Sequence, residues 1–173
     1  MEIDTDKARQ LTSRIIPLLS ARLPPSAHPL LALLKLDQTL SVAAFADGIS
    51  QAALDACVIT AGRHFAGLAA VLEEGHPLRG IALAELGKLL AVDEPTPRQT
   101  SSSFPPSGPA RLKLAYDTLV KARRELLIGF GRENEVGRAV RENIVALEKE
   151  LGVWTTGVRH VLEDSLVKPS RQS

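Results

Sequence analysis

The chain has 173 residues with 21 basic and 20 acidic side chains mixed along it, which excludes the concentrated positive patch that nucleic-acid backbones require. Its single cysteine, Cys57, excludes an intrachain disulfide and a cysteine-rich zinc site. Aromatic residues make up only 3%, so a core of Leu, Ala and Val is expected, a composition that suits packed helices.

Two further features predict where the protein resides. The first six residues include three acidic side chains and lack the apolar stretch of a secretory signal peptide. No run of about 18 uncharged apolar residues occurs, so no membrane-spanning helix is expected. These observations predict a cytoplasmic or nuclear protein that binds neither membranes nor nucleic acid.

Two helices are predicted before the turn signal Asp47-Gly48. The first covers residues 4–23, and Pro17 inside it is expected to kink or divide it. The second begins at Pro29 and runs to about residue 46. A proline in the first turn sacrifices no hydrogen bond, because the N–H groups there have no partner within the helix.

The third predicted helix has the cleanest amphipathic pattern in the chain. Ser50 is a favourable N-cap, because its hydroxyl can accept a hydrogen bond from a free backbone N–H. Apolar residues then alternate at spacings of three and four: Leu54, Val58, Ala61, Phe65, Leu68 and Leu72. The pattern predicts about 25 helical residues, roughly 37 Å, ended by Gly75 in a left-handed conformation.

The tripeptide His-Pro-Leu occurs twice, at residues 28–30 and 76–78, and each copy opens an apolar helix-like run. A helix start that recurs after 48 residues is typical of stacked helical hairpins. The sequence therefore predicts an all-α fold in which antiparallel helical hairpins stack as a tetratricopeptide-like superhelical array. All 173 residues are expected to form one domain.

The segment 93–109 interrupts this pattern with five prolines and four serines, and it is expected to be a flexible insertion. Helical periodicity resumes at Ala110 and continues to about Gly129. Another helix is predicted over 136–151, with Trp154 closing its apolar stripe. A short last helix carries Val158, Val161, Leu162 and Leu166, before a polar tail at 168–173.

Several segments carry a resemblance to a known family. Gly75-His76-Pro77-Leu78, followed by the run Ile81–Leu89, resembles the C-terminal tetratricopeptide-like domain of the SET and MYND protein-lysine methyltransferases. Leu114–Asp117 and Phe130–Glu133 are similar to a later repeat of that domain. In the family, a helix of the form Leu-x-x-Leu-Gly-Lys-Leu follows a His-Pro start. The resemblance covers about residues 26–151.

The chain also departs from the family. A SET domain needs an Asn-His-Ser-Cys-type stretch with catalytic tyrosines, and a MYND finger needs a cluster of cysteines. This chain has one Cys and one Tyr and contains neither motif, so it is not expected to be an enzyme. The resemblance implies an accessory domain that walls a substrate cleft and offers a groove to partners, a SET domain among them.

No residue pattern predicts a catalytic, cofactor or metal site. His28 and His76 precede prolines at helix starts, His64 is expected to be a half-buried packing residue, and Cys57 a small apolar filler. No His-Glu-x-x-His or Cys-x-x-Cys pattern supports a metal.

Lys88 and Arg79 are the predicted partner-binding residues. With Gly87 at a close helix contact, Lys88 should face the concave side, and Arg79 is expected to neighbour it. Two cations in a groove can hold a peptide carboxylate. A second basic cluster is a solvated face or a site for an acidic or phosphorylated partner; its residues are Lys121, Arg123 and Arg124.

Three functions are open on the sequence. The first is a non-catalytic scaffold that binds a peptide or protein on its concave face. The second is a fragment or subunit of a protein-lysine methyltransferase that contributes to substrate binding. The third is a helical bundle that self-associates, although the scarcity of Trp and Tyr offers few interface anchors. A monomer or weak oligomer is expected.

Overall fold

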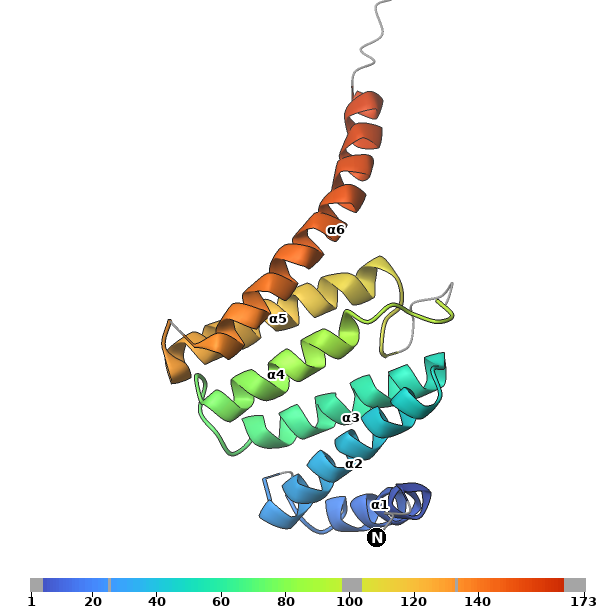
Figure 1. The fold of residues 1–173 in the computed structure, drawn as a ribbon, viewed down its shortest axis with the longest axis vertical. Helices are drawn as coiled ribbons and strands as arrows, with labels where there is room; N and C mark the ends of the chain where they lie inside the picture. Colours follow the sequence, from blue (N-terminus) through green and yellow to red (C-terminus); the bar gives the residue numbers. More distant parts are fainter. Residues whose placement is uncertain (1–4, 25, 98–103, 133, 167–173) are drawn as a thin grey trace, which may run out of the picture.

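The computed structural model describes residues 5–24, 26–97, 104–132 and 134–166, with side chains up to residue 152. Within these residues the chain forms six α-helices and no strand (Figure 1). They are α1 (Thr5–Ser20), α2 (His28–Asp47), α3 (Gln51–Ala69), α4 (Pro77–Leu90), α5 (Pro109–Phe130) and α6 (Glu135–Leu166). Each packs against its neighbours in the chain, so the predicted all-α array of helical hairpins is confirmed.

The main core lies among α3, α4, α5 and α6. Its most deeply buried apolar residues include Val58, Leu83, Leu90, Leu119, Leu126 and Val140. A smaller cluster of Ile16, Leu30 and Leu34 joins α1 to α2. The α4–α5 pair has the most extensive helix contact, whereas α1 contacts only α2 among the described helices. The array therefore has a well-packed centre and a lightly attached first helix.

Glycines allow α4 and α5 to approach closely. A Cβ atom on Gly87 would lie 2.6 Å from Leu119 Cγ, and one on Gly80 would lie 2.8 Å from Leu126 Cγ. These distances are shorter than any normal carbon contact, so only glycine fits at both positions of α4. The predicted role of Gly87 at a close helix contact is confirmed.

Helix α1 continues through Pro17 to Ser20. The expectation that this proline would divide the helix was therefore wrong. Proline removes one backbone hydrogen bond, which would have reached the carbonyl four residues earlier, at Ser13. Both Pro17 and Ser13 are solvent-exposed, so water can satisfy that carbonyl. The helix therefore tolerates the proline near its end.

The third predicted helix is shorter than expected. It ends at Ala69, and Gly75, which has a φ of +89°, follows in the connection instead of terminating the helix. The carbonyl oxygen of Leu72, the last residue of the predicted apolar stripe, accepts a 2.9 Å hydrogen bond from Arg79 Nη1. A side chain therefore satisfies this carbonyl in place of a further helical turn. A Cβ on Gly75 would lie 2.5 Å from Ile128 Cγ2, so glycine is required there.

The last two predicted helices are one helix, α6, which extends beyond the rest of the bundle (Figure 1). Gly152 lies inside it, and a single glycine weakens a helix without breaking it. The predicted apolar side chains at Trp154, Val158, Val161, Leu162 and Leu166 lie outside the described side chains, and the polar tail 168–173 lies outside the described residues.

Both described ends of the proline-rich insertion are attached to the body. The Glu94 carboxylate accepts hydrogen bonds of 2.7 Å from Ser107 Oγ and from the Gly108 N–H, which closes the segment at the start of α5. The Thr96 N–H donates to Gln51 Oε1 at 3.4 Å. The central residues 98–103 of the predicted flexible insertion lie outside the described residues.

Helix α2 is the one described helix long and apolar enough, by length and composition alone, to cross a membrane. Core helices of bundles pass the same test, and α2 packs between α1 and α3. It also carries Lys35 and Asp37 in its middle.

Candidate protein-binding groove

An open groove lies between α2 and α4. It encloses about 340 Å³. Helix α2 contributes Lys35, Gln38, Thr39 and Val42, and α4 contributes Glu85, Lys88 and Leu89. Both helices pack against α3, which holds the two walls apart. The sequence predicted that Lys88 faces the concave side, and the structure places it in the lining of this groove.

A polar cluster joins the two walls. Glu85 Oε2 accepts hydrogen bonds of 2.9 Å from Lys35 Nζ and from Gln38 Nε2. The Lys35 and Glu85 side chains are 46% and 38% exposed, so this ion pair contributes only about 0–1 kcal/mol to stability. Its effect is to orient the two walls and to cancel the Lys35 charge within the groove.

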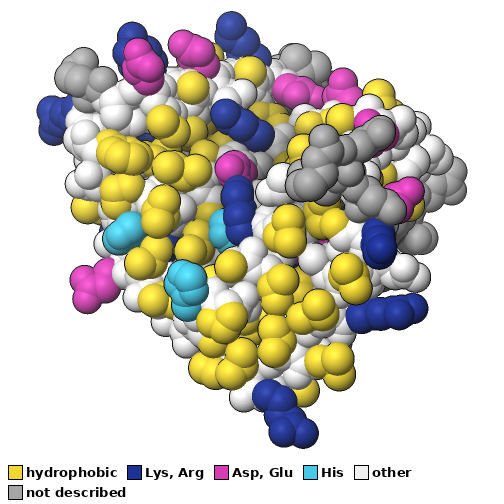
Figure 2. Space-filling view, turned by 60° about the horizontal axis from the view of Figure 1, so that its bottom comes forward, with side chains coloured by type: hydrophobic (Ala, Val, Ile, Leu, Met, Phe, Trp, Pro, Cys, Tyr) yellow, Lys and Arg dark blue, Asp and Glu magenta, His cyan; other side chains and the backbone are white. Residues whose placement is uncertain are grey.

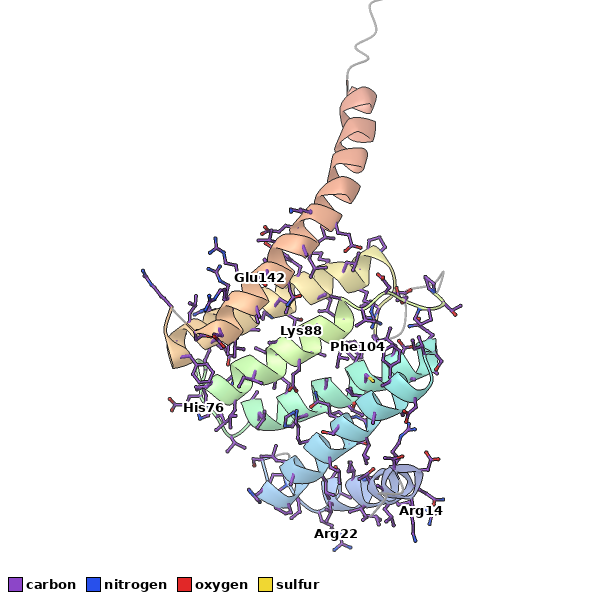
Figure 3. All side chains as sticks on the ribbon, viewed as in Figure 1. Arg14, Arg22, His76, Lys88, Phe104 and Glu142 are labelled. Carbon is purple, nitrogen blue, oxygen red and sulfur yellow. The ribbon has the colours of Figure 1, made fainter. Side chains whose placement is uncertain are left out.

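Lys88, on α4 (Figure 3), is the cation of the groove that no described residue compensates. Its side chain is exposed, and its ammonium has no hydrogen bond or ion pair with any described residue. The preceding residue, Gly87, faces α5, and this contact fixes the rotation of α4 that turns Lys88 toward the groove. The half-exposed Val42 and the side chain of Leu89 offer apolar contact close to this charge.

Arg79 does not neighbour Lys88, and this expectation was wrong. Its Nη2 donates to Glu125 Oε1 at 3.0 Å, its Nη1 donates to the Leu72 carbonyl, and its side chain is only 15% exposed. Nine residues are about two and a half helical turns, so the two cations lie on opposite sides of α4. Arg79 instead lines a hollow between α3 and α5, beside Phe65.

His64, on α3, is close enough to Lys35 and Glu85 of the polar cluster to be affected by their charges. It is 8% exposed, which confirms the packing role predicted for it. Burial lowers the pKa of its imidazole, and the nearby Lys35 charge lowers it further, while Glu85 partly opposes the shift. The ring is therefore neutral at pH 7.

Cys57 is fully buried and its thiol lies 3.2 Å from the Ser41 carbonyl oxygen. Burial raises the pKa of the thiol, so the thiolate is not formed at neutral pH. This setting supports the predicted role of a small core residue. Among the described residues, no group of His, Cys, Asp or Glu is arranged to hold a metal ion.

The predicted basic cluster on α5 is divided between two surfaces. Lys121 and Arg124 line the hollow around Arg79, and Arg124 Nη2 lies 3.5 Å from Glu74 Oε1. Arg123 and Arg124 both line a groove between α5 and α6 with Tyr116, whose hydroxyl donates to Glu148. Arg124 therefore belongs to both surfaces, and neither surface is lined by all three residues.

Sequence reasoning missed Arg111, the largest fully buried side chain of the described residues, at 1% exposure. The position of Arg111 in the sequence could have indicated that its side chain is buried. Counting along α5, Arg111 is in phase with the buried residues Ala115, Leu119, Ala122 and Leu126. A charged residue in phase with a buried stripe predicts a buried ion pair or helix cap.

Comparisons with protein-family models, with curated proteins and with solved structures found no match. The resemblance to the SET and MYND methyltransferases therefore rests on the sequence motifs alone and stays a prediction.

Proposed function

We propose that this protein is a non-catalytic interaction scaffold that binds a peptide segment of a protein partner in the groove between α2 and α4. The observation that carries the proposal is the unpaired ammonium of Lys88 beside the apolar surface of Val42 and Leu89. Lys35 and Glu85 neutralise each other, so the groove retains one positive charge.

This chemistry favours a segment with an apolar side chain next to a carboxylate. The volume of about 340 Å³ is at the small end of the range for ligand pockets, so it suits one or two side chains of a peptide. The carboxylate can then accept a charge-assisted hydrogen bond from Lys88 Nζ.

The test is to select peptides from a displayed random library on the wild-type protein and to measure their affinities by fluorescence anisotropy. Peptides rich in Asp or Glu beside an apolar residue are expected. Lys88→Glu should weaken their binding by about tenfold or more, which corresponds to about 1.4 kcal/mol. Val42→Asp should weaken it as well, because it places a charge on the apolar wall.

The matched control is Lys113→Glu, which makes the same charge change at an exposed position of α5 outside the groove. It should leave the affinities unchanged. Selected peptides that bind wild type and Lys88→Glu equally well, or a library that yields no binder, would rule out this groove as the site.

The resemblance to SET and MYND methyltransferases supports a second proposal, in which the chain works as a fragment or subunit of such an enzyme and contributes to substrate binding. Calorimetric titration of this chain with the methyl donor separates the roles. Binding of the donor by the chain alone would contradict its assignment as non-catalytic.

Self-association of the bundle is the third proposal, and it is supported only by the exposed grooves. Sedimentation velocity over a hundredfold range of concentration tests it. A mass that does not change with concentration would argue against it and would favour the monomeric scaffold.

A further inference from the structure

The outer side of α1 exposes an apolar stripe. Leu11, Ile15 and Leu18, spaced by four and three residues, are 50%, 38% and 69% exposed. Thr12 and Ile16 lie on the other side of the helix and are buried. The α1 end of the molecule is turned toward the viewer in Figure 2, where hydrophobic side chains gather on this surface with Lys and Arg side chains around them.

This stripe lies on the first of the described helices. Among the described helices α1 packs only against α2, whereas each helix from α2 to α5 packs against two neighbours in the chain. Terminal helices of stacked arrays normally present a polar outer face, which keeps the array soluble. The exposed stripe of α1 is what an interior helix would bury against the next one.

Basic side chains share this face of α1. Lys7 and Arg14 lie one turn before and one turn after Leu11 in α1, and Arg22 lies four residues after Leu18, just beyond the end of α1; all three are exposed. Arg14 and Arg22 project away from α2 (Figure 3) and pair with no described residue.

The acidic residue of α1 lies elsewhere on the helix. Asp6 falls about 130° around the helix from the centre of this face, at 100° per residue. The apolar stripe together with these three cations is here named the α1 outer face, and no acidic residue of α1 shares it.

We propose that the α1 outer face binds an amphipathic helix of a protein partner whose apolar stripe is flanked by Asp or Glu. The spacing of Leu11, Ile15 and Leu18 matches the rows of side chains that interlock when two helices pack. The flanking cations then select for acidic neighbours of the partner's stripe. This site lies apart from the α2–α4 groove and does not depend on the function proposed for it.

Charge and composition argue against two other occupants of the α1 outer face, a second copy of the chain and an anionic lipid surface. A second copy bound through a two-fold axis would bring Arg14 and Arg22 against the same cations of its partner, which is unfavourable. Anionic lipid also attracts basic and apolar residues, but interfacial helices use Trp or Phe for anchoring, and this stripe is aliphatic.

The test uses two synthetic helical peptides of about 18 residues, or five turns, labelled with a fluorophore. Both carry the same stripe of Leu, flanked in one by Glu and in the other by Lys. Fluorescence anisotropy should show binding of the Glu peptide at least about tenfold tighter than of the Lys peptide. Arg14→Glu combined with Arg22→Glu should reverse this preference, and Leu11→Ser combined with Leu18→Ser should abolish binding of both.

Two control variants test whether the effects on binding are specific to the α1 outer face. Lys113→Glu alters charge at an exposed site on α5, and Ile49→Ser removes an apolar residue that is 75% exposed in the turn after α2. Neither should change the affinity for the Glu peptide. Circular dichroism should show the same helix content in all variants.

Three outcomes would overturn the proposal. These are no binding of the Glu peptide, equal binding of the two peptides, and binding that survives both double variants. Vesicles of phosphatidylcholine with about one third phosphatidylserine form a separate arm. Co-sedimentation with these vesicles that is lost in the same double variants would assign the face to a membrane instead.

Discussion

Arg111 Nε donates a 3.0 Å hydrogen bond to the carbonyl oxygen of Leu90, so a buried side chain of α5 caps the C-terminal end of α4. Its Nη2 donates to the Leu89 carbonyl at 3.1 Å, and its Nη1 lies 3.5 Å from Asp55 Oδ1 in α3. The last carbonyls of a helix lack partners within it and carry partial negative charge, which favours a cation there. One guanidinium therefore joins three helices.

Replacing Arg111 with Met should lower the free energy of unfolding by about 3–5 kcal/mol, because a buried carboxylate and two carbonyls lose a charged partner. Equilibrium urea denaturation measures this change. Lys113→Met, two residues along the same helix but exposed, is the matched control and should have little effect. A loss below about 1 kcal/mol in Arg111→Met would place the capping role in doubt.

Gly87→Ala should destabilise the protein by about 1–3 kcal/mol, because the added methyl group would overlap Leu119 in the most extensive helix contact. Gly62→Ala is the matched control. Gly62 also lies inside a helix, but nothing lies within 4 Å of where its Cβ would be. That change should stabilise the protein by about 0.5–1 kcal/mol. Thermal unfolding followed by circular dichroism should show shifts of opposite sign, and shifts of the same sign would be inconsistent with this packing.

The two His-Pro-Leu tripeptides should respond differently to the same substitution. His76 is the N-cap of α4, and its Nδ1 accepts a 3.2 Å hydrogen bond from the Leu78 N–H. His28 is instead the first residue of α2, where no side-chain cap is formed. We expect His76→Ala to cost about 0.5–2 kcal/mol and His28→Ala only a few tenths. Urea denaturation of the two variants compares them, and equal losses would show that the His76 hydrogen bond adds nothing.

Stability should fall as the solution becomes mildly acidic, in part because of His64. Burial and Lys35 lower the pKa of His64 in the folded protein, so the unfolded chain takes up its proton first. His64 makes its full contribution to the free energy of unfolding above pH 6.5, which is the ordinary pKa of a histidine. This contribution is lost as the pH falls from 6.5 through the lowered pKa of His64 in the folded protein. Urea midpoints at several pH values between about 5 and 8 measure this dependence.

His64→Gln should flatten the pH dependence between those limits, because a neutral side chain takes up no proton. His28→Gln, at an exposed position, serves as the control and should leave the His64 contribution in place. An identical pH profile for wild type and His64→Gln would show that another group controls acid stability.

Helix starts could be predicted from the sequence. Ser50 caps α3 by accepting a 3.2 Å hydrogen bond from the Ala53 N–H, and both predicted prolines lie in the first turns of α2 and α4. A cap or a proline acts within one turn, so its effect depends on residues close in the chain. The apolar stripe of α3 also depends only on residues within one helix, and its members Leu54 and Val58 are fully buried as predicted.

Helix ends and the partners of charged side chains could not be predicted in the same way. The apolar pattern of α3 continued to Leu72, but the helix ends at Ala69, and the Leu72 carbonyl accepts from Arg79. The phase of Arg111 along α5 indicates a buried position, but nothing in the sequence identifies the end of α4 as the partner of its guanidinium. In both cases the deciding partner is not a neighbour within the same helix.

The sequence by itself determined an all-α array, its helix starts and the close approach at Gly87, because periodicity, capping and small size act over a few residues or along one helix face. Only the tertiary structure decided that Arg79 pairs with Glu125, while Lys88 lies at a groove with no partner among the described residues. That choice depends on which helix covers each side of α4, and the Arg79–Glu125 contact joins residues 46 positions apart.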